Sequence, residues 1–226
     1  MNRASFLSTS VAAAAVVPGG SALVEPRADF DEAGFARAVA RPADIRQLWE
    51  AVSFHPAVFN NVKNALNGLQ FGYGYAPGRI ATVFAPHGPS SAYTYSDDVW
   101  QRYRIGEALG IKDSNGKPIE SNIWLRPPSA FENTADPNDP QGMYQDTSIA
   151  TLQSRGVVFL TCHTAVEEQA RNIVKNGFAP AGTTAPAVAD DILTHLIPGA
   201  RVVPAMVATV AVLQQRYHYS YITMTF

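Results

Sequence analysis

The sequence predicts a three-layer α/β/α domain built on a mainly parallel sheet of about five strands. Apolar runs such as Ile80–Ala85 and Val157–Leu160 are continuous, which is typical of strands buried on both faces of a parallel sheet. Segments with helical spacing of apolar residues separate these runs, and that alternation favours an α/β fold. The 226 residues contain 46% hydrophobic residues and no internal repeat, which suits one compact domain.

Residues 1–22 have the pattern of an export signal. They combine a short positive start, an alanine-rich apolar stretch from Phe6 to Val17, and small residues at 20–22. The segment from Arg3 to Leu7 resembles a twin-arginine signal with Ala4 in place of the second arginine, and a general secretory signal also fits. The stretch is shorter than the ~20 residues of a membrane span. We expect a periplasmic or otherwise exported bacterial protein without a membrane span in the mature chain; a cytosolic protein with an N-terminal arm is the alternative.

The first half of the mature chain is expected to contain an arm and two strand–helix units. The arm covers 23–44, and one domain covers 45–226. We expect, in order, a helix at 31–39, a strand at 45–52, a helix at 58–69, a strand at 80–85, a turn at 86–89 and a helix at 96–109. Arg46, Gln47 and Glu50 make the first strand look like an edge strand. Ser96 is a plausible N-cap of the last helix.

Residues 112–145 form a predicted insertion without regular structure. Successive turns are marked by Asn115-Gly116, Pro127-Pro128, Asp136-Pro137 and Asp139-Pro140. A loop of this length in a compact domain tends to be a lid, a binding loop or an interface arm. The alternative is a surface excursion that is clamped to the domain by Trp124, Leu125 and Phe131.

The second half is expected to alternate helices and strands to the end of the chain. The elements expected are a helix at 146–155, a strand ending near 162, helices before Gly177 and before Pro198, a strand at 202–203, a helix at 205–215 and a strand at 219–224. Thr164 and Glu167 have the spacing of a capping box, so we expect Thr164 to cap the helix that follows Cys162.

Cys162 is the only cysteine and the first candidate for chemistry. It follows an apolar strand, and ligands of parallel sheets collect at the carboxyl ends of strands. The next helix N-terminus favours a thiolate, although Glu167 and Glu168 in its first turn oppose it. We expect His87, His163 and Thr164 to line a pocket at the same strand ends. A small buried hydrophobic residue is the alternative role of a lone cysteine.

Several short apolar blocks resemble a known family. The blocks Phe84–Pro89, Val157–Cys162, Ile192–Val207 and Leu213–Ile222 are similar to those of DsrE-like proteins, which are small sulfur-relay domains. The resemblance spans residues 45–222 and is clearest in the second half. It implies that Cys162 binds or relays sulfane sulfur as a persulfide, with a sulfur donor or acceptor protein as partner. It also implies a homo-oligomer, either a trimer or a hexamer.

A metal or small-ligand site is the second hypothesis. His55, His87, Cys162 and His163 each follow a predicted strand, and Met206 follows the short strand at 202–203. If the sheet is parallel, all of these residues reach one edge. A Cys/His/Met group suits copper, with zinc or haem iron less favoured. No segment has the tight spacing of a metal motif, and no other cofactor is expected.

The third hypothesis is a non-catalytic assembly module, in which 112–145 and the apolar helices form the interface of a homo-oligomer. Nucleic acid is not an expected partner, because the net charge of -2 and the absence of a Lys/Arg cluster give no electrostatic attraction. The chain also lacks a phosphate loop and a dinucleotide fingerprint. Whether the protein is an enzyme, such as a sulfurtransferase-like carrier, stays open at this level.

Overall fold

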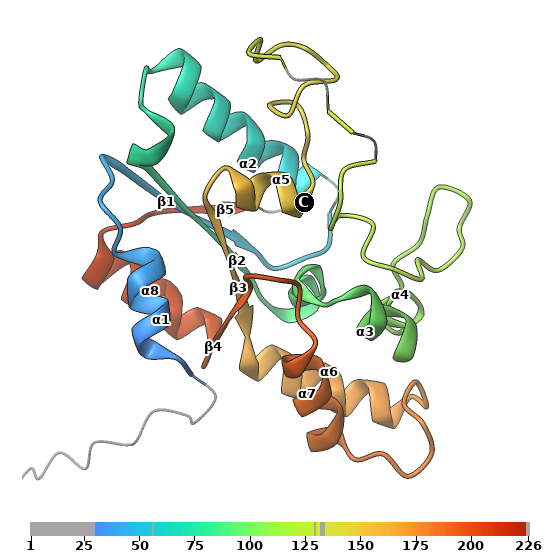
Figure 1. The fold of residues 1–226 in the computed structure, drawn as a ribbon. Helices are drawn as coiled ribbons and strands as arrows, with labels where there is room; N and C mark the ends of the chain where they lie inside the picture. Colours follow the sequence, from blue (N-terminus) through green and yellow to red (C-terminus); the bar gives the residue numbers. More distant parts are fainter. Residues whose placement is uncertain (1–29, 56, 129, 132–133, 225–226) are drawn as a thin grey trace, which may run out of the picture.

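The computed structural model describes residues 30–224, except residues 56, 129, 132 and 133 (Figure 1). The expected export signal and residues 23–29 of the expected arm lie outside these residues. The predicted fold class is confirmed: five parallel strands form one sheet with helices around it. None of the helices in the described part of the chain has the length and apolar character needed to cross a membrane.

The five strands have the spatial order β4-β3-β2-β1-β5, and every neighbouring pair is parallel. Their bounds are β1 Ile45–Ala51, β2 Ile80–Pro86, β3 Val157–Cys162, β4 Arg201–Val203 and β5 Ser220–Met224. The sequence suggested that β1 lies at an edge, and that interpretation is wrong because β1 lies between β2 and β5. Its polar residues have partners inside the domain. Gln47 Nε2, for example, donates to Thr82 Oγ1 of β2 at 2.9 Å.

Helices cover both faces of the sheet (Figure 1). One face packs against α1 Glu32–Val39 and α8 Met206–Tyr217, and the other packs against α2 Ala57–Asn67 and α5 Ile149–Ser154. Side chains alternate along β1, so Leu48 joins the core on the α1/α8 face while Trp49 and Ala51 join the opposite core. This alternation fixes which residues at the strand ends share a face.

A third apolar cluster joins α3 Asp97–Arg102, α4 Ile105–Ala108, α6 His163–Lys175 and α7 Ala185–Thr194. The single helix expected at 96–109 is therefore wrong, since α3 and α4 are separated at Arg104, which adopts a left-handed conformation with φ 46°. Ser96 is the N-cap of α3, as expected, and its side chain accepts from Val99 N–H. Gly110 ends the segment with φ 69°.

The predicted capping box is also wrong. β3 continues through Cys162, and α6 begins at the next residue, His163, with Cys162 at the N-cap position. Thr164 lies inside the helix, and its hydroxyl donates to the carbonyl of Pro204 at 2.9 Å. The strand therefore passes into the helix without the short turn that a Thr164 cap requires.

The 112–145 segment is held to the domain near its middle and at its end. Asn122 Nδ2 donates to the carbonyls of Tyr93 and Tyr95 at 2.8 and 2.9 Å. Trp124 packs on Phe54 with a ring separation of 4.8 Å, and Leu125 is buried. Phe131 is exposed, so it does not take part in the expected clamp. Trp124 and Leu125 support the interpretation of a clamped surface excursion.

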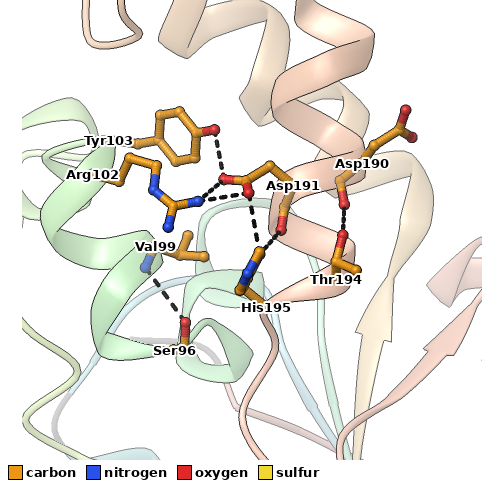
Figure 2. A network of polar contacts seen from close by, with 8 residues as sticks. All are labelled: Ser96, Val99, Arg102, Tyr103, Asp190, Asp191, Thr194 and His195. Atoms are coloured by element: carbon orange, nitrogen blue, oxygen red, sulfur yellow. Dashed lines mark hydrogen bonds and ion pairs between the residues drawn. The ribbon is translucent and has the colours of Figure 1, made fainter.

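Three residues from two helices surround the Asp191 carboxylate and join α7 to α3 (Figure 2). Arg102 donates to both oxygens at 2.6 and 2.5 Å, Tyr103 donates at 2.7 Å, and His195 Nδ1 lies 3.1 Å from one oxygen. Partial burial disfavours the charged form, but the hydrogen bonds from Tyr103 and Arg102 outweigh it and hold the pKa of Asp191 below 3.8. Burial, followed by the bond to Asp191, raises the pKa of Tyr103 to about 12.

This network predicts a specific loss of stability in acid. The pKa of Asp191 is lower in the folded than in the unfolded chain. Its contribution to the free energy of unfolding is therefore complete above pH 3.8, and it is lost as the pH falls through the pKa of the folded state. In urea unfolding at pH 7 and pH 3, Asp191→Asn is expected to lose less free energy on acidification than the wild type. The neighbouring exposed Asp190→Asn serves as the control. Equal acid sensitivity of the wild type and Asp191→Asn would contradict the prediction.

Candidate functional site

Buried polar side chains gather at the C-terminal edge of the sheet, near the ends of β1, β2 and β3. The group comprises Glu50, Ser90, Ser91, Thr94, Thr161, His163 and Gln169, all of them buried. Burying polar groups is costly unless each finds a hydrogen-bond partner, so such a concentration is not expected of a purely structural core. The carboxyl ends of parallel strands are also where α/β proteins bind ligands. We therefore treat this edge as the candidate functional site.

Cys162 ends β3 with its side chain on the α1/α8 face. The residue is buried, with 5% exposure, and its Sγ accepts a hydrogen bond from the backbone N–H of Met206 at 3.3 Å. Met206 is the first residue of α8, a helix of 12 residues. The first amides of a helix lack intrahelical acceptors and carry the positive end of its dipole, so this contact favours negative charge on sulfur. The sequence placed Cys162 beside one helix N-terminus, and the structure adds a second.

A chain of hydrogen bonds near Cys162 joins Tyr95, Gln169 and Gly88. Tyr95 donates to Gln169 Oε1 at 2.9 Å, and Gln169 Nε2 donates to the carbonyl of Gly88 at 2.5 Å. Burial, followed by the charge of a Cys162 thiolate, raises the pKa of Tyr95 well above 10, so its hydroxyl stays protonated. Gly88 directly follows His87, so the hydrogen-bonded chain links the surroundings of the thiol to the end of β2.

Glu50, His87 and Tyr221 form a second polar group at the same edge. His87 Nε2 lies 2.9 Å from one Glu50 oxygen, and the Tyr221 hydroxyl donates to the other. That hydrogen bond is the main cause that raises the pKa of Tyr221. Glu50 is buried, so its carboxylate depends on these two partners in place of water. His87 is half-buried.

Glu50, His87 and Cys162 lie on the same face of three adjacent strands. Glu50 is two residues after Leu48, and Cys162 is two residues after Leu160; both leucines belong to the α1/α8 core. His87 is extended, with φ −145° and ψ 170°, and its N–H donates to the carbonyl of Ala51 at 3.0 Å, so it continues the line of β2. β2 lies between β1 and β3. The histidine is thus placed between the carboxylate and the thiol across the edge.

No protein-family model, no curated protein and no solved structure matches the chain. The chemistry proposed for this edge therefore depends on its geometry, and the resemblance to DsrE-like proteins stays an expectation.

The other predicted site residues have different surroundings. His163 is buried beside Cys162 and lines a cavity of about 230 Å³ together with Glu167 and Arg171 of α6. Thr164 is exposed and bonded to Pro204. His55 lies after β1, where its Nδ1 accepts from the N–H of Ala57 at 3.2 Å. The structure thus brings His87, Cys162 and His163 to one edge, while Thr164 and His55 engage backbone groups.

The part of the chain that the structure describes contains no group of side chains that could ligate copper. Among the residues that the structure describes, no three His, Cys, Asp or Glu side chains are grouped so that they could hold a metal ion. Met206 reaches Cys162 through its backbone N–H, and its side chain is buried in the apolar core.

Sequence reasoning missed Glu50, Tyr221, Tyr95 and Gln169. One signal was available: Glu50 is an acidic residue near the carboxyl end of a strand, the position at which α/β proteins place functional groups. Interpreting β1 as an edge strand gave Glu50 a solvent-facing role and concealed this signal. Tyr95 and Gln169 carry no comparable local pattern.

Proposed function

We propose that this protein is an exported DsrE-like domain that holds sulfane sulfur as a persulfide on Cys162. The observation that carries the proposal is the hydrogen bond from the first amide of α8 to Cys162 Sγ. The nucleophile in sulfur transfer is the thiolate, and donors at a helix N-terminus stabilise that form. A persulfide anion on the same residue keeps its negative charge near these amides.

The transfer step needs only the thiolate and a donor. The Cys162 thiolate attacks the outer sulfur of a small organic persulfide, R–S–SH, so that a Cys162 S–S bond forms and the donor S–S bond breaks. Cys162 becomes the persulfide, Cys–S–SH, and the donor leaves as the thiolate R–S⁻. We propose His87, which is paired with Glu50 at the same edge of the sheet, as the base that takes up the thiol proton before the attack.

Burial of Cys162 favours holding sulfur over rapid turnover. At 5% exposure the thiol meets donors rarely, and a bound sulfur atom is shielded from thiols in solution. This distinguishes a carrier from a sulfurtransferase with an open active site. The sulfur donor, the acceptor protein and the trimeric or hexameric assembly that the resemblance implies stay predictions.

Intact-mass analysis after treatment with cysteine persulfide tests the proposal. The wild type is expected to gain the mass of one sulfur atom and to lose it on reduction, whereas Cys162→Ala is expected to gain nothing. His87→Asn is expected to load more slowly than the wild type, and His218→Asn, a change at an exposed histidine with a left-handed backbone, is the matched control. A wild type that gains no sulfur, or an alanine variant that gains as much, rules out the carrier.

A further inference from the structure

Two cations, buried Lys63 and half-buried Arg155, lie close together at the opposite edge of the sheet. Lys63 of α2 is buried, and its Nζ donates to Gln145 Oε1 at 2.9 Å. Arg155, at the end of α5, donates from Nη2 to Asn67 Oδ1 at 2.7 Å and stacks over the ring of Tyr144 at 5.2 Å. All of these partners are neutral. In the part of the chain that the structure describes, no carboxylate forms an ion pair with either cation.

Among the residues that the structure describes, this arrangement leaves the two positive charges without a carboxylate partner. Burial, together with the charge of Arg155, lowers the pKa of Lys63, and burial lowers the pKa of Arg155. The Nη1 atom of Arg155 is buried and has no hydrogen-bond partner in the structure. Lysine and arginine are almost never buried without a counter-charge, because a desolvated charge needs a partner of opposite sign. Within the described residues, the site therefore has donors and positive charge but no anionic acceptor.

A cavity of about 150 Å³ lies against Arg155 and Tyr144. Its polar lining comes from Arg155, Ser154, Tyr144 and Gln70, and its apolar lining includes Ile80. Ile80 is the first residue of β2, and Arg155 comes two residues before β3 begins. The cavity is thus at the N-terminal edge of the sheet, about 20 Å along the strands from the Cys162 edge.

We propose that this cavity binds a small oxyanion, with inorganic phosphate as the probe of its size and charge. The guanidinium of Arg155 is the principal donor, because its Nη1 atom has no hydrogen-bond partner in the structure and a charged N–H group binds an oxyanion strongly. Lys63, beside Arg155, supplies a second positive charge near the cavity, and the Gln70 amide is the neutral donor of the lining. The proposal is independent of the chemistry at Cys162.

A purely structural role is the competing explanation. Lys63 bonds Gln145, and Asn67 bonds the carbonyl of Tyr144 at 2.8 Å, so the group also holds the end of the 112–145 segment. The C-terminus of α5 further favours a cation at Arg155. These contacts account for the position of both side chains, but they provide no negative charge. A structural role predicts no dependence of stability on the kind of anion, and that difference decides between the two explanations.

The test measures thermal stability and calorimetric binding in phosphate and in chloride at equal ionic strength, with acetate and sulfate as further arms. We expect saturable stabilisation of the wild type by phosphate beyond that in chloride. Arg155→Gln is expected to weaken phosphate binding about tenfold or more, since a charge-assisted hydrogen bond is lost. Arg216→Gln, which changes an exposed cation on α8, is the matched control and is expected to bind like the wild type.

Lys63→Gln provides a second variant that keeps the test decisive if Arg155→Gln does not fold. It is also expected to weaken phosphate binding, because it removes half of the local charge. Sulfate is expected to compete with phosphate for the cavity. Stabilisation by acetate alone would still support an oxyanion site, with a carboxylate as its ligand. The proposal is overturned if no oxyanion stabilises the wild type beyond chloride. It is equally overturned if the folded Arg155 and Lys63 variants bind phosphate as tightly as Arg216→Gln.

Discussion

Phe59→Ala is expected to lower the free energy of unfolding by about 3–5 kcal/mol, as is typical of a buried phenylalanine. Phe59 of α2 is 1% exposed, and its ring packs against Phe84, Tyr93 and Phe159 at centroid distances of 5.0, 4.7 and 5.9 Å. These neighbours belong to β2, to the segment after β2 and to β3, the elements that lead to the candidate site. Truncation removes edge-to-face contacts as well as apolar burial.

Denaturant unfolding measures this loss, and Phe71→Ala is the matched control. Phe71 is 42% exposed and packs on Tyr144 at 4.9 Å, so its truncation is expected to cost about 1 kcal/mol or less. Equal losses of the free energy of unfolding in Phe59→Ala and Phe71→Ala would show that the buried aromatic cluster at β2 and β3 stabilises the protein no more than an exposed aromatic contact does.

Phe59→Ala also distinguishes two routes by which sulfur could reach Cys162: loading of the folded protein and loading after unfolding. Cys162 is the only thiol and is buried, so a large thiol reagent that reaches it only through unfolding reports the unfolded population. Phe59→Ala is expected to accelerate that labelling by about two to four orders of magnitude. Loading of the folded state by a small persulfide would rise far less. A parallel rise of both rates would mean that sulfur enters only after unfolding, which contradicts a carrier that functions while folded.

Much of the fold is predictable because its signals are local. Continuous apolar runs and helical spacing give all five strands and most of the helices, and the cap at Ser96 follows from a side chain and a backbone group within four residues. Glu50 shows the limit of prediction from local sequence signals. Its partners His87 and Tyr221 are 37 and 171 residues away, and no local pattern specifies which strands become neighbours.

The two wrong helix predictions have the same physical origin. Thr164 has the sequence of an N-cap, yet its hydroxyl bonds Pro204, which is 40 residues distant, and the preceding residues extend β3 instead. In the 96–109 segment the apolar spacing continues past Arg104, but the backbone turns there so that α4 packs against the 112–145 segment. Tertiary contacts thus override local propensity at both positions.

Gly106→Ala is expected to destabilise the protein by about 1–3 kcal/mol or more, as overpacking does. Gly106 lies in α4, and a Cβ built there would lie 2.1 Å from the carbonyl oxygen of Ile119 and 2.7 Å from its nitrogen. Both atoms belong to backbone, which cannot rotate away as a side chain can. The N–H of Ile119 also donates to the carbonyl of Ile111 at 3.0 Å, so a shift at Ile119 strains a further contact. The glycine is therefore required by the close approach of two chain segments.

Gly68→Ala is the matched control, since it makes the same substitution at a helical position where a Cβ meets nothing within 4 Å. Fewer unfolded conformations are available to alanine, so this variant is expected to gain about 0.4–1 kcal/mol. Denaturant unfolding of the two variants should therefore give shifts of opposite sign. A stabilised Gly106→Ala would mean that the 112–145 segment can move away from α4 at little cost. That outcome would favour a mobile lid over the clamped excursion that Asn122, Trp124 and Leu125 support.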